Sequence, residues 1–158
     1  MKKRYEGFSL IEILVVVALI IILAAITIIA INPAKNFRDT RNAQRASDVN
    51  AILNAVTQYT SEQNKRLSDL GSILPCENAS GDPQSTKIGS TPSVTTGDYV
   101  DLAPTLVESA DLIVAIPMDP STGTEEDTGY TICETSGGRV QIAAPGAEQV
   151  AEPIVVKR

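Results

Sequence analysis

The feature that most restricts the fold of this chain is an apolar run near its N-terminus. The nineteen residues from Ile13 to Ile31 contain one polar side chain, that of Thr27. In a helix that rises about 1.5 Å per residue, the run covers roughly 28 Å, close to the thickness of the hydrocarbon core of a bilayer. Because a segment in lipid must satisfy its own backbone hydrogen bonds, the run predicts a single membrane-spanning helix.

Basic residues ahead of the run predict its orientation. Lys2, Lys3 and Arg4 come first in the chain, and the positive-inside rule then holds the N-terminus in the cytoplasm and the remainder outside the membrane. A secretory signal peptide also begins with basic residues, but its apolar region is only about 7–15 residues long and ends in small residues. The length of the run therefore favours an anchor over a signal peptide.

One acid, Glu12, stands directly before this run. A plain anchor gives no reason for it, because ionisable groups at membrane depth cost free energy. The surrounding residues form a pattern: a short basic leader, Met1–Gly7, ends in Gly and is followed by "FSLIEILVVVALI". This pattern closely resembles the prepilin signal of type IV pilins and of the related pseudopilins of type II secretion.

The resemblance implies how the chain is processed. A prepilin peptidase in the membrane would cut between Gly7 and Phe8 and then methylate the new N-terminus on Phe8. Glu12, at the fifth position of the mature chain, is the hallmark acid of that family. The resemblance is strong over residues 4–31 and looser through about residue 66.

Cleavage would create a positive amine on Phe8 at the edge of a region of low dielectric. Glu12 is the negative charge near enough to pair with that amine, and pairing recovers much of the cost of burying two lone charges. The pair could form within one chain, since residues i and i+4 share a helix face, or between neighbouring subunits. The resemblance implies the second arrangement, in which Glu12 sets the register of each subunit entering a filament.

Four segments are expected: a leader peptide (1–7), an apolar membrane or filament-core helix (8–31), an amphipathic second half of that helix (32–66) and a small acidic domain (67–158).

Pro33 predicts a kink. From Asn36 onward, apolar residues recur at three- and four-residue steps and predict one buried face, with the helix ending near Lys65. These residues are Ala46, Val49, Ile52 or Leu53, Val56 and Tyr59.

The arginines at positions 38, 41 and 45 and the acids at 39, 48 and 62 lie mostly off this apolar face in the sequence pattern. We expect the arginine group to be a solvated face with local i, i+3 and i, i+4 pairs. A role in contacting lipid headgroups or another subunit is the alternative.

The C-terminal part predicts a small antiparallel sheet laid against helix residues 43–60, an α+β fold of type IV pilin-like plan. Residues 71–97 are rich in Gly, Ser, Thr and Pro and indicate a surface loop, followed by a short helical turn at 101–109 and an apolar run at 111–116. The stretches "GYTICE" and "GRVQIAA", joined by "TSGG", predict a hairpin. The tail 145–158 is expected to be an edge strand or loosely ordered.

Cys76 and Cys133 are the two cysteines of the chain. Outside the membrane, an even pair predicts a disulfide, and two reduced, buried thiols are the alternative. The acids Asp119, Glu125 and Asp127 invite a calcium site, because oxygen-rich turns bind hard cations. A solvated acidic turn is favoured over that site, so no metal and no cofactor is expected.

Composition argues against catalysis and nucleic-acid binding. The chain has no His, which removes the commonest general base and metal ligand. Residues 67–158 carry four Lys/Arg against fourteen Asp/Glu, whereas residues 1–66 carry nine against five. An acidic domain is a poor partner for a phosphate backbone. We therefore expect no enzyme and no direct nucleic-acid contact.

The favoured function is a structural subunit of a type IV pilus-like filament, made as a single-pass precursor in the cytoplasmic membrane and then exported to the cell surface. Its expected partners are the prepilin peptidase and identical or related subunits. A type II secretion pseudopilin is the first alternative. A membrane-anchored binding domain that never polymerises is the second, and it predicts an uncleaved Gly7–Phe8 bond.

Overall fold

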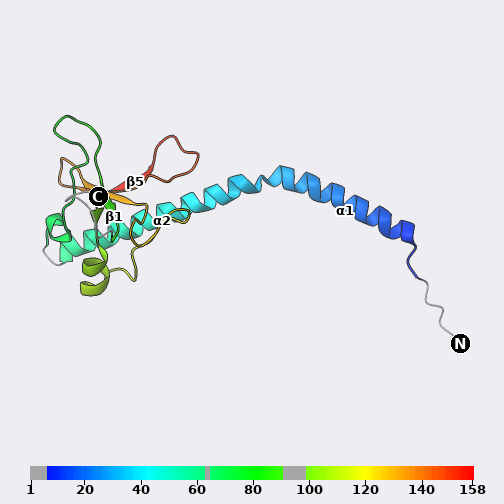
Figure 1. Ribbon diagram of the computed structural model, residues 1–158, viewed down its shortest axis with the longest axis horizontal. Helices are drawn as coiled ribbons and strands as arrows, with labels where there is room; N and C mark the ends of the chain where they lie inside the picture. The colour runs from blue at the N-terminus through cyan, green and yellow to red at the C-terminus, as the bar shows by residue number, and fades with distance from the viewer. Residues whose placement is uncertain (1–6, 63–64, 91–98) are drawn as a thin grey trace. The chain divides into compact units, whose positions relative to one another are not determined.

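The structure is a computed structural model that describes residues 7–62, 65–90 and 99–158 (Figure 1). The chain divides into two compact units, Met1–Phe37 and Arg38–Arg158. Each unit is described by itself below.

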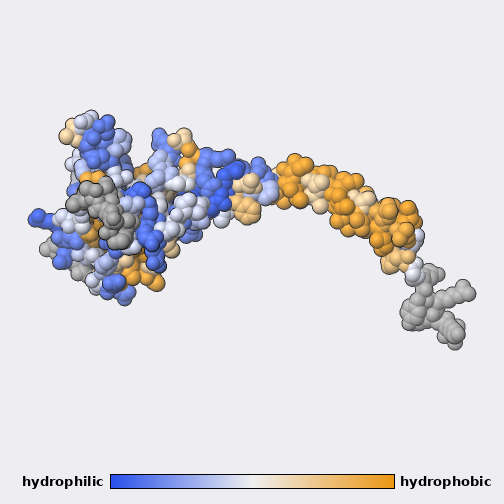
Figure 2. Space-filling view, in the orientation of Figure 1, coloured by the Kyte–Doolittle hydropathy of each residue, from blue (hydrophilic) through white to orange (hydrophobic). Residues whose placement is uncertain are grey.

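The first unit is dominated by helix α1, Leu10–Ile31, which confirms the predicted apolar helix. Its side chains are all exposed, and its surface is hydrophobic in the view of Figure 2. The hydroxyl of Thr27 donates to the carbonyl of Leu23 at 2.8 Å, so this polar side chain is satisfied inside the helix. By length and composition, α1 is suited to cross a membrane.

Helix α1 is followed by its C-cap residue Asn32, whose backbone adopts the left-handed conformation with φ 47° and ψ 71°. Asn tolerates this region better than most residues, and its side-chain oxygen accepts a hydrogen bond from the N–H of Lys35 at 3.2 Å. Pro33 then opens helix α2, Pro33–Glu62, a first position where proline lacks only an N–H that would have no helical partner. The predicted interruption at Pro33 is confirmed. Helix α2 is described as far as Glu62, three residues before the predicted end near Lys65.

In the second unit, one face of α2 is buried, as its apolar spacing predicts. Both candidates at the third position of the pattern, Ile52 and Leu53, are buried, and Ala46 is half-buried. A core cluster forms where this face meets the sheet and η2, a π-helix over Ala103–Ser109. The helical turn expected at 101–109 is therefore confirmed, whereas residues 111–116 form neither helix nor strand.

The sheet has five strands: β1 Thr86–Ile88, β2 Tyr99–Val100, β3 Thr131–Glu134, β4 Val140–Ala144 and β5 Ile154–Lys157. Their order in the sheet is β2-β1-β3-β4-β5. The predicted hairpin is confirmed as the antiparallel pair β3–β4, and the tail forms the predicted edge strand β5.

Two details of the sheet differ from the prediction. Strand β1 lies inside the segment expected to be a surface loop, and its Thr86 and Ile88 are buried. Strand β1 also pairs in parallel with β2, so the sheet is mixed rather than purely antiparallel. Strands of three and two residues are too short to show the two-residue alternation of side chains that predicts a strand. A parallel pair also has no hairpin turn that would indicate the pairing in the sequence.

The predicted disulfide is present between Cys76 and Cys133, whose Cα atoms lie 4.9 Å apart. Cys133 belongs to β3, and the N–H of Cys76 donates to the carbonyl of Glu134 at 2.8 Å. The bond and this backbone contact together hold the start of the long loop 71–85 against the middle of the sheet.

Candidate processing and assembly site

The residues implied in processing lie at the entry to α1. Gly7 and Phe8 have no regular structure and are exposed, with Phe8 80 % accessible. Ser9 is extended, with φ −76° and ψ 143°, and Leu10 is the first helical residue. The Gly7–Phe8 peptide bond therefore lies just outside the helix, where an enzyme can bind the backbone in an extended form.

The chain itself does not require glycine at position 7. A Cβ built on Gly7 meets no atom within 4 Å, and the backbone there is not left-handed. Glycine usually occurs where a positive φ or a close backbone approach excludes a side chain. Neither reason applies to Gly7 among the residues that the structure describes.

Glu12 lies in the first turn of α1. It is the ionisable side chain of that helix, and a helix N-terminus favours an anion through its unbonded N–H groups. Within the part of the chain that the structure describes, no cationic side chain pairs with Glu12. Since the helix begins at Leu10, Phe8 and Glu12 do not share a helix face in the uncleaved chain.

The comparison with known families agrees with this geometry: residues 2–31 match the prokaryotic N-terminal methylation motif. The chain carries a type IV pilin-like prepilin motif. The motif takes in the leader, the Gly7–Phe8 bond, Glu12 and the apolar run, and it confirms the resemblance seen in the sequence. It implies processing by a prepilin peptidase and association with a membrane. No curated protein and no solved structure matches the chain.

The sequence did not predict a group of long-range charge contacts, an ion cluster made of Arg41, Arg45, Asp119 and Glu148. Arg45 is 1 % exposed and binds Asp119 through two hydrogen bonds, from Nε at 2.6 Å and Nη2 at 3.0 Å. Its Nη1 donates to Glu148 at 3.1 Å. Arg41 binds the same Glu148 through two bonds, at 2.5 and 2.6 Å.

The ion cluster corrects the expectation of a solvated arginine face. Arg45 lies four residues before Val49 and so falls on the buried face of α2. Its long side chain carries the charge to acids that are far away in sequence, which no local i, i+4 pattern reveals. The sequence feature that could have predicted the burial of Arg45 is its position on the same helix face as Val49, Ile52 and Tyr59.

Electrostatics holds both acids of the ion cluster in their charged form. Burial alone would raise the pKa of Asp119, but hydrogen bonds from Arg45 and from the N–H groups of Ser121 and Thr122 outweigh it and hold that pKa below its usual value. Hydrogen bonds from Arg41 and then Arg45 lower the pKa of Glu148 to about 2. The cluster thus remains ionised at any physiological pH.

A neighbouring polar contact also joins α2 to Tyr130, the residue directly before strand β3. The hydroxyl of buried Tyr130 donates to Asp48 at 2.7 Å, and Gln44 donates to the other oxygen of Asp48 at 2.7 Å. Burial, followed by the bond to Asp48, raises the pKa of Tyr130. Together with the ion cluster, this contact secures the first half of the domain's helix to loops that are distant in sequence.

The calcium candidates do not come together. The carboxylate of Asp119 is used by Arg45, and that of Asp127 by Lys87 at 2.8 Å and by Tyr99 at 2.9 Å. Glu125 is exposed. Within the described ranges, no three acidic, His or Cys side chains are grouped as metal ligands would be.

Proposed function

We propose that this protein is a structural subunit of a type IV pilus-like filament. The observation that carries the proposal is the match to the N-terminal methylation motif at residues 2–31, combined with a helix that is apolar on every side and holds one acid in its first turn. A helix apolar all round requires either lipid or other helices around it.

The proposed subunit exists in two successive states, a membrane precursor and an assembled filament subunit. As a precursor it spans the cytoplasmic membrane through α1, with the domain Arg38–Arg158 outside. After a prepilin peptidase cuts the Gly7–Phe8 bond and methylates Phe8, the subunit leaves lipid for a bundle of α1 helices. Packing between helices drives this transfer. The new amine of Phe8, paired with Glu12 of a neighbouring copy, selects the axial register.

The first test is the N-terminus of the native protein. Trypsin should release from the mature chain a peptide that starts at Phe8, ends at Lys35 and is one methyl group heavier than its sequence. An intact Gly7–Phe8 bond would reject the proposal and favour the anchored binding domain that never polymerises.

The second test is filament assembly by Glu12→Val. We expect this variant to be cleaved and inserted normally and to give filaments at a small fraction of the wild-type yield, on the order of one tenth, because the amine then has no partner. Thr27→Val is the matched control, since it removes a polar group from the same helix without removing a charge. Normal fibres from Glu12→Val, seen by electron microscopy and counted against Thr27→Val, would remove the registering role.

The same motif also serves pseudopilins of type II secretion. A mature, methylated protein that forms no surface fibres, but is required for release of a secreted protein, would favour this second function. Cleavage and methylation at the N-terminus are expected for a pilus subunit and for a pseudopilin alike. The presence or absence of surface fibres therefore discriminates between these two functions.

A further inference from the structure

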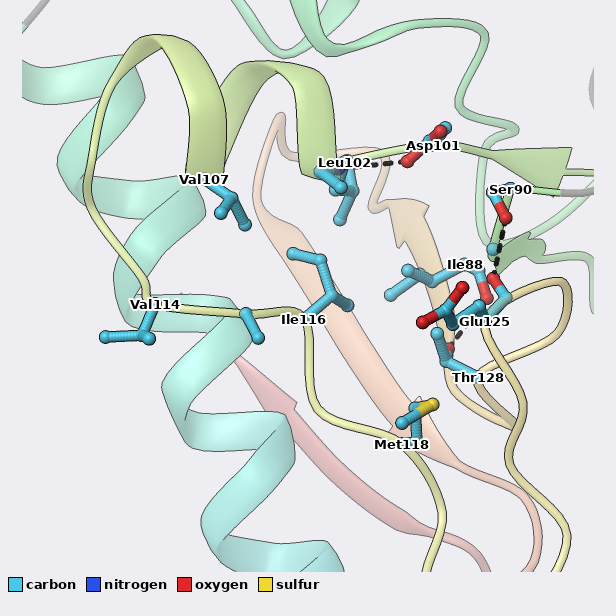
Figure 3. Close-up of a pocket in the computed structure, with 13 residues that line it drawn as sticks. Ile88, Ser90, Asp101, Leu102, Val107, Val114, Ile116, Met118, Glu125 and Thr128 are labelled. Atoms are coloured by element: carbon cyan, nitrogen blue, oxygen red, sulfur yellow. Dashed lines mark hydrogen bonds between the residues drawn. The ribbon is translucent and has the colours of Figure 1, made fainter.

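A groove in the domain is lined by apolar side chains from residues 88, 102–107 and 114–118 (Figure 3). Its volume is about 320 Å³, and Ile88, Leu102 and Ile116 face one another across it. At its mouth, Val114 is 94 % exposed and Met118 is also exposed. A dry cavity of about 150 Å³ is enough to hold benzene, so this groove has room for one phenyl ring and the aliphatic carbons beside it.

The rim of the groove is acidic. Asp101 and Glu125 line it, and residues 99–128, which supply most of its wall, contain seven Asp/Glu and no Lys or Arg. Asp119 and Asp127 are paired with Arg45 and Lys87, whereas the two acids that line the groove, Asp101 and Glu125, form no salt bridge with a described residue. The side chain that fits this groove is therefore apolar and carried on a basic segment.

The same chain contains such a segment. Phe8 and Phe37 are the exposed aromatic residues among those that the structure describes, and Phe8 belongs to the processing site. Phe37 is 65 % exposed and stands between Lys35 and Arg38 in the sequence. It follows the end of α1 by six residues, which is about 9 Å in a helix. In the precursor, that distance places its ring near the lipid headgroups, which extend roughly 5–7 Å beyond the hydrocarbon core.

We propose that the acidic groove of one copy receives Phe37 of a second copy in the filament. The inference rests on the proposed function. When a subunit leaves the bilayer, the ring of Phe37 loses its lipid cover and needs another apolar surface, which the groove offers. The carboxylates of Asp101 and Glu125 then face the basic groups beside the ring, and charge complementarity of this kind fixes which partner docks and in which register.

The symmetry of this contact suits a filament. A ring on one copy and a groove on the next are different surfaces, so the contact is heterologous, and heterologous contacts that do not close into a ring build open helical assemblies. The groove contact would add a second specific link between copies outside the apolar core. The pairing of Phe8 and Glu12 sets the axial position, and the groove sets which face of the neighbouring domain is presented.

Photo-crosslinking of the full-length protein tests the inference. Phe37 is replaced by p-benzoylphenylalanine, which keeps an aromatic ring, and filaments sheared from cells are irradiated. After reduction, trypsin cuts after Lys87 and Arg139, so the complete groove lies in the single peptide 88–139. We expect a covalent dimer in which Phe37 of one copy is joined to this peptide of another.

Matched variants then test the specificity of the contact. Val114→Lys removes an apolar contact and adds a repelling charge at an exposed position, and it should lower the crosslinked dimer about fivefold. Val150→Lys makes the same change at an exposed valine outside the groove and should have no effect. Glu125→Lys should lower the yield, and Lys35→Glu in the same chain should restore it, because both copies then carry the reversed pair.

Each outcome separates the two proposals. Filaments that form normally but crosslink Phe37 to lipid, to its own copy or to peptides outside 88–139 would overturn the groove contact and leave the proposed function standing. Equal loss from Val114→Lys and Val150→Lys would overturn it as well. If Phe8 is never exposed by cleavage and no fibre forms, the proposed function fails, and the groove contact fails with it.

Discussion

The ion cluster offers the sharpest test of what holds the domain to its helix. Replacing Arg45 by Met keeps an unbranched apolar stem in place of the aliphatic part of the side chain and removes five hydrogen bonds, which reach Asp119, Glu148, Asn42 and Ser121. Asp119 would then remain buried as a carboxylate whose guanidinium partner is gone. Its remaining side-chain partners are the N–H groups of the turn that follows it and a long contact from a hydroxyl in that turn.

Removing one partner of a buried ion pair costs about 3–5 kcal/mol. We expect Arg45→Met near the lower end of that range, because the turn still donates to Asp119. Asp119→Leu is expected near the upper end, because it removes the acceptor of two hydrogen bonds from buried Arg45 and also the acceptor of the N–H groups in the turn. For the unit Arg38–Arg158, a loss of about 3 kcal/mol lowers Tm by roughly 10–15 °C.

The double variant Arg45→Met/Asp119→Leu gives the decisive quantity. Replacing both members of a buried pair by apolar side chains is often close to neutral. The double variant should therefore be less destabilised than the sum of the single variants, by about 2–3 kcal/mol of coupling energy.

Equilibrium urea unfolding of the full-length protein in mild detergent measures these changes. The chain has no Trp and four Tyr, and three of these tyrosines lie in the unit Arg38–Arg158, so tyrosine emission reports on the domain rather than on α1. Lys87→Met is the matched control, because it breaks an ion pair whose side chains are 51 % and 36 % exposed and should cost less than about 1 kcal/mol. An Arg45→Met loss no larger than this, or a coupling energy near zero, would refute the reasoning.

Three further predictions use the same unfolding assay. The pKa values of Asp119 and Glu148 are lower in the folded protein than in the unfolded chain. The free energy of unfolding should therefore stay constant above about pH 4.5 and fall as the pH is lowered towards 2. A free energy of unfolding that does not change over this acid range would contradict the prediction. Replacing Cys76 and Cys133 by Ala should cost about 4 kcal/mol by chain entropy, and native protein with two reactive thiols would disprove the bond. Tyr130→Phe should cost about 1–3 kcal/mol because buried Asp48 loses a donor, whereas Tyr99→Phe, whose hydroxyl meets a more exposed carboxylate, should cost less than half as much.

Much of the fold follows from local patterns. The run Ile13–Ile31 predicts its own helix, because lipid permits a single span no other backbone arrangement. The buried face of α2 and the hairpin β3–β4 follow from spacings of three to four and of two residues, which the backbone geometry imposes wherever one face is covered. The processing motif is likewise local, since Gly7, Phe8 and Glu12 lie within six residues.

The domain's polar interior could not be predicted in this way. Arg45 and Asp119 are 74 residues apart, and nothing near either one in the chain indicates the other. The parallel pairing of β1 with β2 could not be predicted from the sequence either. The register of such short strands depends on the strands beside them in the folded sheet.

The chain's sequence alone thus determined the apolar helix α1, the N-terminal methylation motif and the apolar faces that meet in the core, since each is encoded by neighbours along the backbone. Tertiary structure decided the partner of each buried charge, the mixed sheet and the acidic groove beside the exposed Val114. These features bring together segments that are far apart in sequence. Burial then determines which charged groups need a partner, and that requirement exists only in the folded chain.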